Sequence, residues 1–165
     1  MVESKAPDRI QEAWGALESV MDPEIPVVSI VGLGIVRTIE EVDYGLKVTM
    51  TPTFAGCPAL EVIKREIRES LSALNQGAIE VEMVYSPPWS TDWIRPDARQ
   101  ALKDFGIAPA PEHGGRINMV LEAPARCPYC DADDTRQMNS FGPTACKTIH
   151  VCQACRQPFE AFKPL

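Results

Sequence analysis

The chain has 165 residues, 45% of them apolar, which allows one ordinary core or a core plus a small module. Its net charge of −7 is uneven, since residues 1–115 carry −8 and residues 116–165 carry +1. Neither part has the basic field that a phosphate backbone requires, so no nucleic-acid partner is expected. The sequence has no apolar run near the ~20 residues that span a bilayer and no signal-peptide core, so we expect a cytoplasmic protein without a membrane partner.

The first two thirds of the chain contain both helical and strand patterns. Apolar residues at helical spacing predict three helices, over residues 7–21, 58–74 and 96–105. Alternating apolar and polar residues predict three strands, over residues 35–42, 46–51 and 79–85. The first two strands are separated by a short turn, so we expect them to pair as a hairpin.

Glycine and proline indicate a boundary near the middle of the chain. Residues 106–115 hold three glycines and two prolines, the composition of an interdomain linker. The sequence therefore predicts a domain over 1–105, a linker over 106–115 and a small module over 116–165. A short strand over 117–121 would lead into the module, and His113 in the linker is expected to be solvated.

Two CxxC pairs dominate the small module. Cys127 and Cys130 form the first pair, and Cys152 and Cys155 form the second, with 21 residues between the pairs. Four thiolates at this spacing suit a tetrahedral zinc ion, whose binding would supply folding energy that fifty residues cannot obtain from a core. The pattern predicts a structural zinc site with four cysteine ligands, although iron or an iron–sulfur cluster also accepts four thiolates.

Two neighbouring residues leave the ligand set open. Cys146 or His150 could replace one member of the second pair, because both lie within a few residues of it. Cys152 and Cys155 are preferred since they repeat the spacing of the first pair. Cys146 is then either a small core residue or a second, exchangeable metal ligand.

Cys57 stands apart from the other cysteines, directly before the second predicted helix. With Pro58 as the first helical residue, the helix dipole would lower the pKa of the thiol and favour the reactive thiolate. Cys57 is also in phase with the apolar stripe of that helix at Leu60, as a buried core cysteine would be. The sequence alone leaves both interpretations open.

Two further groups of residues have an open role. Asp22 and Glu24 flank Pro23, shortly before Pro26, and are typical of a capped turn. Trp89 and Trp93 lie in an irregular, proline-containing segment, where they would either fill the side of the core or present a surface to a partner.

Several segments together resemble a known family. Residues 22–34 (DPEIPVVSIVGLG), 51–58 (TPTFAGCP) and 87–89 (PPW) resemble the SufT-type domain of iron–sulfur cluster assembly factors. Residues 89–94 (WSTDWI), 140–147 (SFGPTACK) and 158–163 (PFEAFK) extend this resemblance to the PaaD (PaaJ) family, accessory subunits encoded with the multicomponent phenylacetyl-CoA epoxidase.

The resemblance implies an α+β domain with a small mixed sheet against helices, followed by the zinc ribbon. It also implies that Cys57 contacts iron or a cluster, supported by Asp22 and Glu24. The leading hypothesis is a non-enzymatic maturation factor that delivers iron or an iron–sulfur cluster to the oxygenase or its reductase, with the ribbon as a docking platform. A homodimer pairing two Cys57 residues would be one way to complete the site.

Two alternatives have different requirements. An interaction subunit would stabilise the oxygenase assembly without carrying metal, and would depend on Trp89 and Trp93 rather than on Cys57. A thiol-dependent enzyme would need a base beside Cys57, and the two histidines of the chain are not convincingly placed for that role.

Overall fold

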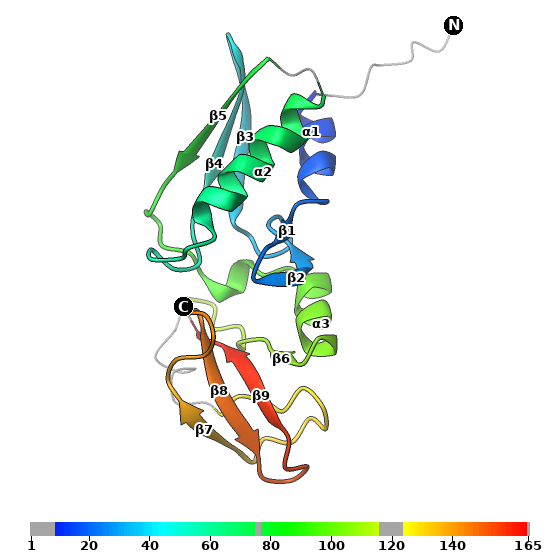
Figure 1. Ribbon diagram of the computed structural model, residues 1–165, viewed down its shortest axis with the longest axis vertical. Coiled ribbons are helices and arrows are strands. Elements are labelled where there is room, and N and C mark those ends of the chain that lie inside the picture. Colours follow the sequence, from blue (N-terminus) through cyan, green and yellow to red (C-terminus); the bar gives the residue numbers. More distant parts are fainter. Residues whose placement is uncertain (1–8, 75–76, 116–123, 165) are drawn as a thin grey trace, which may run out of the picture.

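The computed structural model describes residues 9–74, 77–115 and 124–164. Two units follow one another along the long axis of the molecule (Figure 1). The N-terminal unit comprises the described residues of 9–105, and the ribbon unit comprises those of 106–164. Within the described residues, no helix combines the length and the apolar character needed to cross a membrane.

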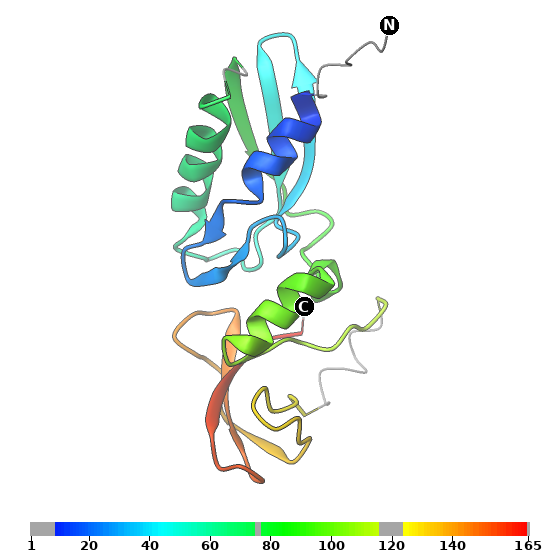
Figure 2. The same cartoon turned by 90° about the vertical axis from the view of Figure 1, so that its right-hand side faces the viewer.

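A three-stranded mixed sheet forms the centre of the N-terminal unit. β3 (Val36–Val42) and β4 (Gly45–Met50) pair antiparallel, and β5 (Ala78–Met83) runs parallel to β4. A parallel partner requires a crossover, which α2 (Leu60–Ser72) supplies. α1 (Arg9–Leu17) and α2 pack against this sheet (Figures 1 and 2). The predicted α+β fold with a mixed sheet is therefore confirmed.

The apolar stripe predicted for the second helix faces the core. Ile63, Ile67 and Leu71 of α2 are at most 1% exposed, and they belong to the same buried cluster as Leu46 and Val48 of β4. Complete burial of one such side chain contributes roughly 1.5–3 kcal/mol. Packing of this stripe therefore holds the crossover helix, and the loop that precedes it, against the sheet.

The first helix is shorter than its apolar pattern predicts. α1 ends at Leu17, and Met21 instead belongs to β1 (Met21–Asp22), which pairs antiparallel with β2 (Ile25–Ser29). The Val20 amide donates to the Leu17 carbonyl in the turn that follows the helix. Tertiary pairing with β2 thus overrides helical periodicity for the last residues of the pattern.

The loop after β2 makes close backbone contact with the segment that follows β5. Gly34 has a φ of +69°, and a Cβ there would lie 2.7 Å from the backbone oxygen of Trp93. The Arg95 amide donates to the Gly32 carbonyl at 2.9 Å. Only glycine fits at position 34, because both the backbone conformation and the space exclude a side chain.

The ribbon unit is a four-stranded sheet of order β6-β9-β8-β7. Its strands in chain order are β6 (Ile107–Ala108), β7 (Thr135–Asn139), β8 (Lys147–Cys152) and β9 (Pro158–Phe162).

Part of the expected linker belongs to this sheet. β6 pairs parallel with β9, and Ile107 and Ala108 are at most 3% exposed. α3 (Pro96–Asp104) leads directly into β6. A linker over all of 106–115 was therefore the wrong prediction, because pairing with a strand fifty residues later gives no local signal. The strand expected over 117–121 lies outside the described residues.

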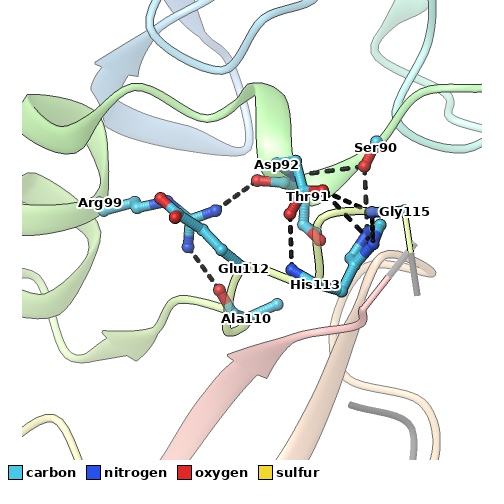
Figure 3. Close-up of polar contacts among 8 residues, drawn as sticks. All are labelled: Ser90, Thr91, Asp92, Arg99, Ala110, Glu112, His113 and Gly115. Carbon is cyan, nitrogen blue, oxygen red and sulfur yellow. Dashed lines mark hydrogen bonds and ion pairs between the residues drawn. The ribbon is translucent and has the colours of Figure 1, made fainter. Parts of the chain in front are cut away.

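Arg99 of α3 links the segment that precedes this helix to the segment that follows β6 (Figure 3). Its guanidinium donates to the carbonyls of Thr91 and Ala110, and lies 3.6 Å from a carboxylate oxygen of Glu112. Hydrogen bonds from a charged donor are among the stronger ones in proteins, about 1.5–3 kcal/mol. These contacts fix residues 110–112 against the N-terminal unit.

His113 lies beside the same contacts. Contrary to expectation, its side chain is not solvated. Its side chain is 6% exposed, and its ring contacts the Ser90 hydroxyl at 3.1 Å and the Asp92 carboxylate at 3.3 Å (Figure 3). The His113 amide also donates to Asp92 at 2.7 Å. This amide hydrogen bond is the largest of the interactions that lower the pKa of the Asp92 carboxyl.

Candidate metal-binding sites

The two CxxC pairs meet at one end of the ribbon unit. The sulfur atoms of Cys127, Cys130, Cys152 and Cys155 all lie within 4.8 Å of one another, and we call this group the four-sulfur site. Cys127 and Cys152 are fully buried, whereas Cys130 is exposed. The predicted set of four ligands is thus brought together by the fold.

Each pair forms the same turn. The amide of Asp131 donates to the Cys127 carbonyl at 3.0 Å, and the amide of Arg156 donates to the Cys152 carbonyl at 3.1 Å. Asp131 and Arg156 adopt φ values of 60° and 64°, a left-handed conformation that glycine usually occupies. Two non-glycine residues in this conformation indicate that the turns are held by the rest of the site.

The spacing of the sulfurs suits a tetrahedral metal ion. Cys127 Sγ lies 3.7 Å from Cys155 Sγ, and Cys130 Sγ lies 3.6 Å from Cys152 Sγ. Zinc–sulfur bonds of about 2.3 Å in a tetrahedron place the sulfurs roughly 3.8 Å apart. The donor set and its geometry therefore fit a closed structural zinc site.

Backbone donors also favour thiolate at this site. The Cys155 amide points at Cys152 Sγ at 3.4 Å, and this hydrogen bond is the main reason that the pKa of Cys152 falls to about 7. Burial, in contrast, raises the pKa of Cys127. A metal ion would remove the remaining protons, because only thiolate sulfur coordinates it.

The two alternative ligands lie elsewhere, so the prediction that either could replace a member of the second pair is not supported. His150 on β8 is buried, with Nε2 2.8 Å from the Thr148 hydroxyl and its ring stacked on Phe159. Its burial lowers the pKa of the imidazole and favours the neutral form. Cys146 lines a separate cavity.

That cavity, which we call the interunit cavity, has a volume of about 140 Å³ and lies between the two units. Its polar and sulfur-containing walls come from Asp22, Glu24 and Cys57 of the N-terminal unit and from Thr144 and Cys146 of the ribbon unit. Its apolar walls are formed by Ile25, Leu33, Phe54, Pro58, Pro143, Ala145 and Phe162, together with Thr53.

Cys57 lies at the end of the loop that joins β4 to α2. Its amide donates to the Phe54 carbonyl at 3.1 Å, and the helix starts only at Leu60, with Ala59 as N-cap. The predicted role of Pro58 as first helical residue is therefore wrong. The prediction of a lowered pKa is wrong too, because burial is the largest influence and raises the pKa of the half-buried thiol.

Asp22 caps a turn and also lines the interunit cavity. One carboxylate oxygen accepts the amides of Glu24 at 2.8 Å and Ile25 at 3.0 Å, as expected for a capped turn. Burial is nevertheless the strongest influence and raises the pKa of the carboxyl, while the charge of Glu24 adds to the effect. The structure thus brings both carboxylates to the cavity that Cys57 lines.

Cys146 reaches the same cavity from the loop before β8. Its carbonyl accepts the Lys163 amide at 2.9 Å, and its sulfur lies 3.3 Å from the Thr144 hydroxyl. Burial raises the pKa of this thiol. The sequence left Cys146 open as an alternate ligand of the four-sulfur site, a core residue or a second metal ligand, because nothing local indicates which distant residues it faces.

The two tryptophans differ in exposure. Trp89 is 4% exposed, donates its indole N–H to the Leu33 carbonyl at 2.9 Å, and packs on Phe162 with ring centroids 6.0 Å apart. A partner surface at Trp89 was therefore the wrong prediction, and the residue fills the core instead. Trp93 is half-buried under the Arg37 guanidinium, 3.5 Å from the ring centroid.

Comparison with known proteins agrees with this architecture. Residues 10–83 match the model of the iron–sulfur cluster assembly protein family, and residues 116–163 match that of the PaaD zinc beta ribbon domain. A protein of Escherichia coli (strain K12), named as a subunit of 1,2-phenylacetyl-CoA epoxidase, is 39% identical over 96% of this chain and 94% of its own length. The chain belongs to the PaaD family.

Other relatives match the N-terminal half. The Fe-S protein maturation auxiliary factor YitW of Bacillus subtilis (strain 168) is 41% identical, over 56% of this chain and 91% of its own. The crystal structure of a domain of unknown function, DUF59, from Bacillus anthracis is 34% identical and superposes with a TM-score of 0.54. It covers 57% of this PaaD-family chain and 91% of the other.

Proposed function

We propose that this chain is a maturation factor for a multicomponent phenylacetyl-CoA epoxidase. It receives iron or an iron–sulfur cluster at Cys57 and passes it to the oxygenase subunit or its reductase partner. The main observation in support is that Cys57 lines a cavity beside two carboxylates, separate from the four-sulfur site of the ribbon. The names of the Escherichia coli and Bacillus subtilis relatives agree with this role.

The chemistry of the cavity suits temporary rather than permanent binding. A thiol whose pKa is raised by burial holds its proton at neutral pH, so each bound cation must displace that proton. Proton competition weakens binding, which a carrier needs if it is to release its cargo. The buried Asp22 carboxylate can attract the arriving cation and orient it toward the sulfur.

We assign the ribbon unit to docking. Its fold would be fixed by zinc, which leaves its surface free to recognise a client. Tyr129, Met138 and Phe141 expose more than half of their surface, and aromatic residues and methionine are enriched at interfaces. Trp89 has no part in this surface because it is buried, so the docking role does not depend on it.

Reconstitution tests the carrier role. The epoxidase subunits are produced with the wild-type chain, with Cys57→Ser, or with no accessory chain, and each preparation is assayed for bound iron and epoxidation. We expect Cys57→Ser to resemble the preparation without the chain. If this variant gave full iron loading and activity, the carrier role would be excluded in favour of a purely stabilising subunit.

A further inference from the structure

The interunit cavity collects metal-ligating groups from both units. Cys57 and Asp22 belong to the part that matches the iron–sulfur assembly family, whereas Cys146 belongs to the part that matches the PaaD ribbon. The two thiols are close enough that charge on Cys146 raises the pKa of Cys57. The Asp22 carboxylate acts on both thiols in the same way. All three groups line one cavity, although Asp22 and Cys146 are 124 positions apart in the sequence.

The cavity is acidic and lacks a balancing cation. No lysine, arginine or histidine occurs among the described residues that line it. The basic side chain that acts on Asp22 and Cys146 is Lys147, whose ammonium pairs with Glu160 at 2.5 Å. The Asp22 carboxylate is buried and has no cationic partner in this lining, so a bound cation would offset the cost of burying its charge.

Both thiols are positioned by backbone contacts rather than by flexible segments. The loop that carries Cys146 is closed by the Gly142 amide, which donates to the Lys147 carbonyl at 2.8 Å. The Lys163 ammonium donates to the Ala145 carbonyl at 2.6 Å. On the other side, the Cys57 carbonyl accepts the first amide of α2, that of Leu60, at 3.4 Å. The two sulfurs are thus presented to one cavity by two ordered loops.

We propose that Cys146 supplies a second thiolate to the site of Cys57, so that Cys57, Cys146 and Asp22 bind one thiophilic divalent cation, such as ferrous iron, within a single chain. This inference deepens the proposed function, since the cation is the cargo assigned to Cys57. Binding replaces two sulfur–hydrogen bonds by two metal–sulfur bonds and releases two protons to solvent, with no change of oxidation state. A second copy of the chain is then not needed to complete the site.

Cobalt(II) titration tests the site without an activity assay. The probe is added under anaerobic conditions to the full-length chain whose four-sulfur site is already filled with zinc, because zinc outcompetes cobalt for that site. Bound cobalt is read from its sulfur-to-metal charge-transfer absorption. We compare the wild type with Cys57→Ser, Cys146→Ser and the double variant Cys146→Ser/Ser140→Cys, which keeps the number of cysteines constant.

We expect wild-type protein to bind cobalt with two thiolates and to remain monomeric. Each single variant should lose about half of the charge-transfer intensity per cobalt and at least about 100-fold in affinity, more than the 10- to 100-fold typical of an outer-shell change. The double variant should behave like Cys146→Ser. Retained zinc and an unchanged circular dichroism spectrum would show that the fold is intact.

The outcomes separate this inference from the proposed function. Loss in Cys57→Ser with unchanged binding in Cys146→Ser would overturn the two-thiol site while the carrier role of Cys57 stands. Dimerisation on cobalt binding in Cys146→Ser, with wild-type intensity, would likewise favour a pair of Cys57 residues and overturn the inference. If both single variants lose cobalt but mature the epoxidase normally in reconstitution, the site exists and the proposed function fails.

Discussion

The two cysteine centres of this chain differ in completeness. The four-sulfur site draws all of its donors from the ribbon unit, within 4.8 Å of one another, and its geometry fits a tetrahedral ion. The interunit cavity has fewer thiols, which come from both units, and carboxylates beside them. A complete set of ligands retains its metal, whereas an incomplete set shared between two units can exchange it.

In proton affinity only one thiol of the four-sulfur site differs from those of the cavity, because the pKa values of Cys127, Cys130 and Cys155 are raised. A backbone amide lowers the pKa of Cys152 to about 7 in the four-sulfur site, so a metal there meets little competition from that proton. Burial raises the pKa of Cys57 and of Cys146 in the cavity. Because four thiolates would hold zinc in the ribbon and only two line the cavity, acidification should release a cation from the cavity before it releases zinc.

The largest expected effect is loss of the ribbon fold on removal of its metal. Cys152→Ser, or exhaustive chelation, should unfold residues 124–164, because metal binding contributes on the order of 10 kcal/mol to such a module. Hydrogen exchange should show full loss of protection in β7 and β8 while β3, β4 and α2 stay protected. Cys146→Ser is the matched control and should keep its zinc and its protection. A ribbon that stays protected after verified metal loss would contradict this view.

The next effect concerns the contact that joins the two units. Phe162 is 3% exposed, packs on Trp89 and lines the interunit cavity. Phe162→Ala should lower the free energy of unfolding by about 3–5 kcal/mol, as for other buried aromatic residues, and weaken cobalt binding in the cavity.

Phe141→Ala provides the control, because Phe141 is 63% exposed and its ring lies under the Lys163 ammonium. It should cost no more than about 1 kcal/mol in chemical denaturation and leave cobalt binding unchanged. Equal destabilisation by both substitutions would show that Phe162 does not couple the units.

Local patterns in the sequence predicted much of the N-terminal unit. The stripe through Ile63 and Ile67 identified α2, and alternation identified the β3–β4 hairpin, because both signals arise within a single element. The four ligands of the ribbon followed from the repeated spacing of Cys127–Cys130 and Cys152–Cys155, for which each turn is also local.

Long-range contacts explain what the sequence did not predict. β6 exists because Ile107 and Ala108 pair with β9, and neither residue carries a strand pattern of its own. The sign of the Cys57 pKa shift depends on burial of the thiol, which a helix-terminus argument ignores. That Cys57 and Cys146 line one cavity depends on how the units pack, and no spacing within either segment encodes it.

A smaller effect should separate stability from binding at the cavity. Asp22→Asn keeps an oxygen that accepts the Glu24 and Ile25 amides but removes a buried charge. We expect a gain of about 1 kcal/mol in the free energy of unfolding at pH 7, together with weaker cobalt binding. Asp43→Asn, on an exposed turn, should change neither property.

The gain from Asp22→Asn should depend on pH with a defined sign. Burial raises the pKa of Asp22 in the folded state, so its charge destabilises the fold above that pKa. The cost fades as pH falls through the folded pKa and is absent below the unfolded value of about 3.9. Urea denaturation between pH 7 and pH 4 should show the difference between variant and wild type shrinking. A difference that grows on acidification would contradict this account.

The smallest expected effect tests whether the two turns of the four-sulfur site are strained. Exposed Arg156 adopts a φ of 64°, and its amide hydrogen bond to the Cys152 carbonyl would survive substitution by glycine. Relief of about 1–2 kcal/mol of left-handed strain, less the added entropy of an unfolded glycine, leaves a gain of about 0.5–1 kcal/mol.

Because folding of the ribbon is linked to its metal, this gain corresponds to zinc affinity roughly two- to fivefold higher in competition with a chelator. Arg156→Ala is the control, since alanine suffers the same strain as arginine and should show no gain. Asp131 is less suitable because its carboxylate pairs with the Lys103 ammonium at 2.5 Å. If alanine improved affinity as much as glycine, loss of the arginine side chain rather than release of backbone strain would be the cause.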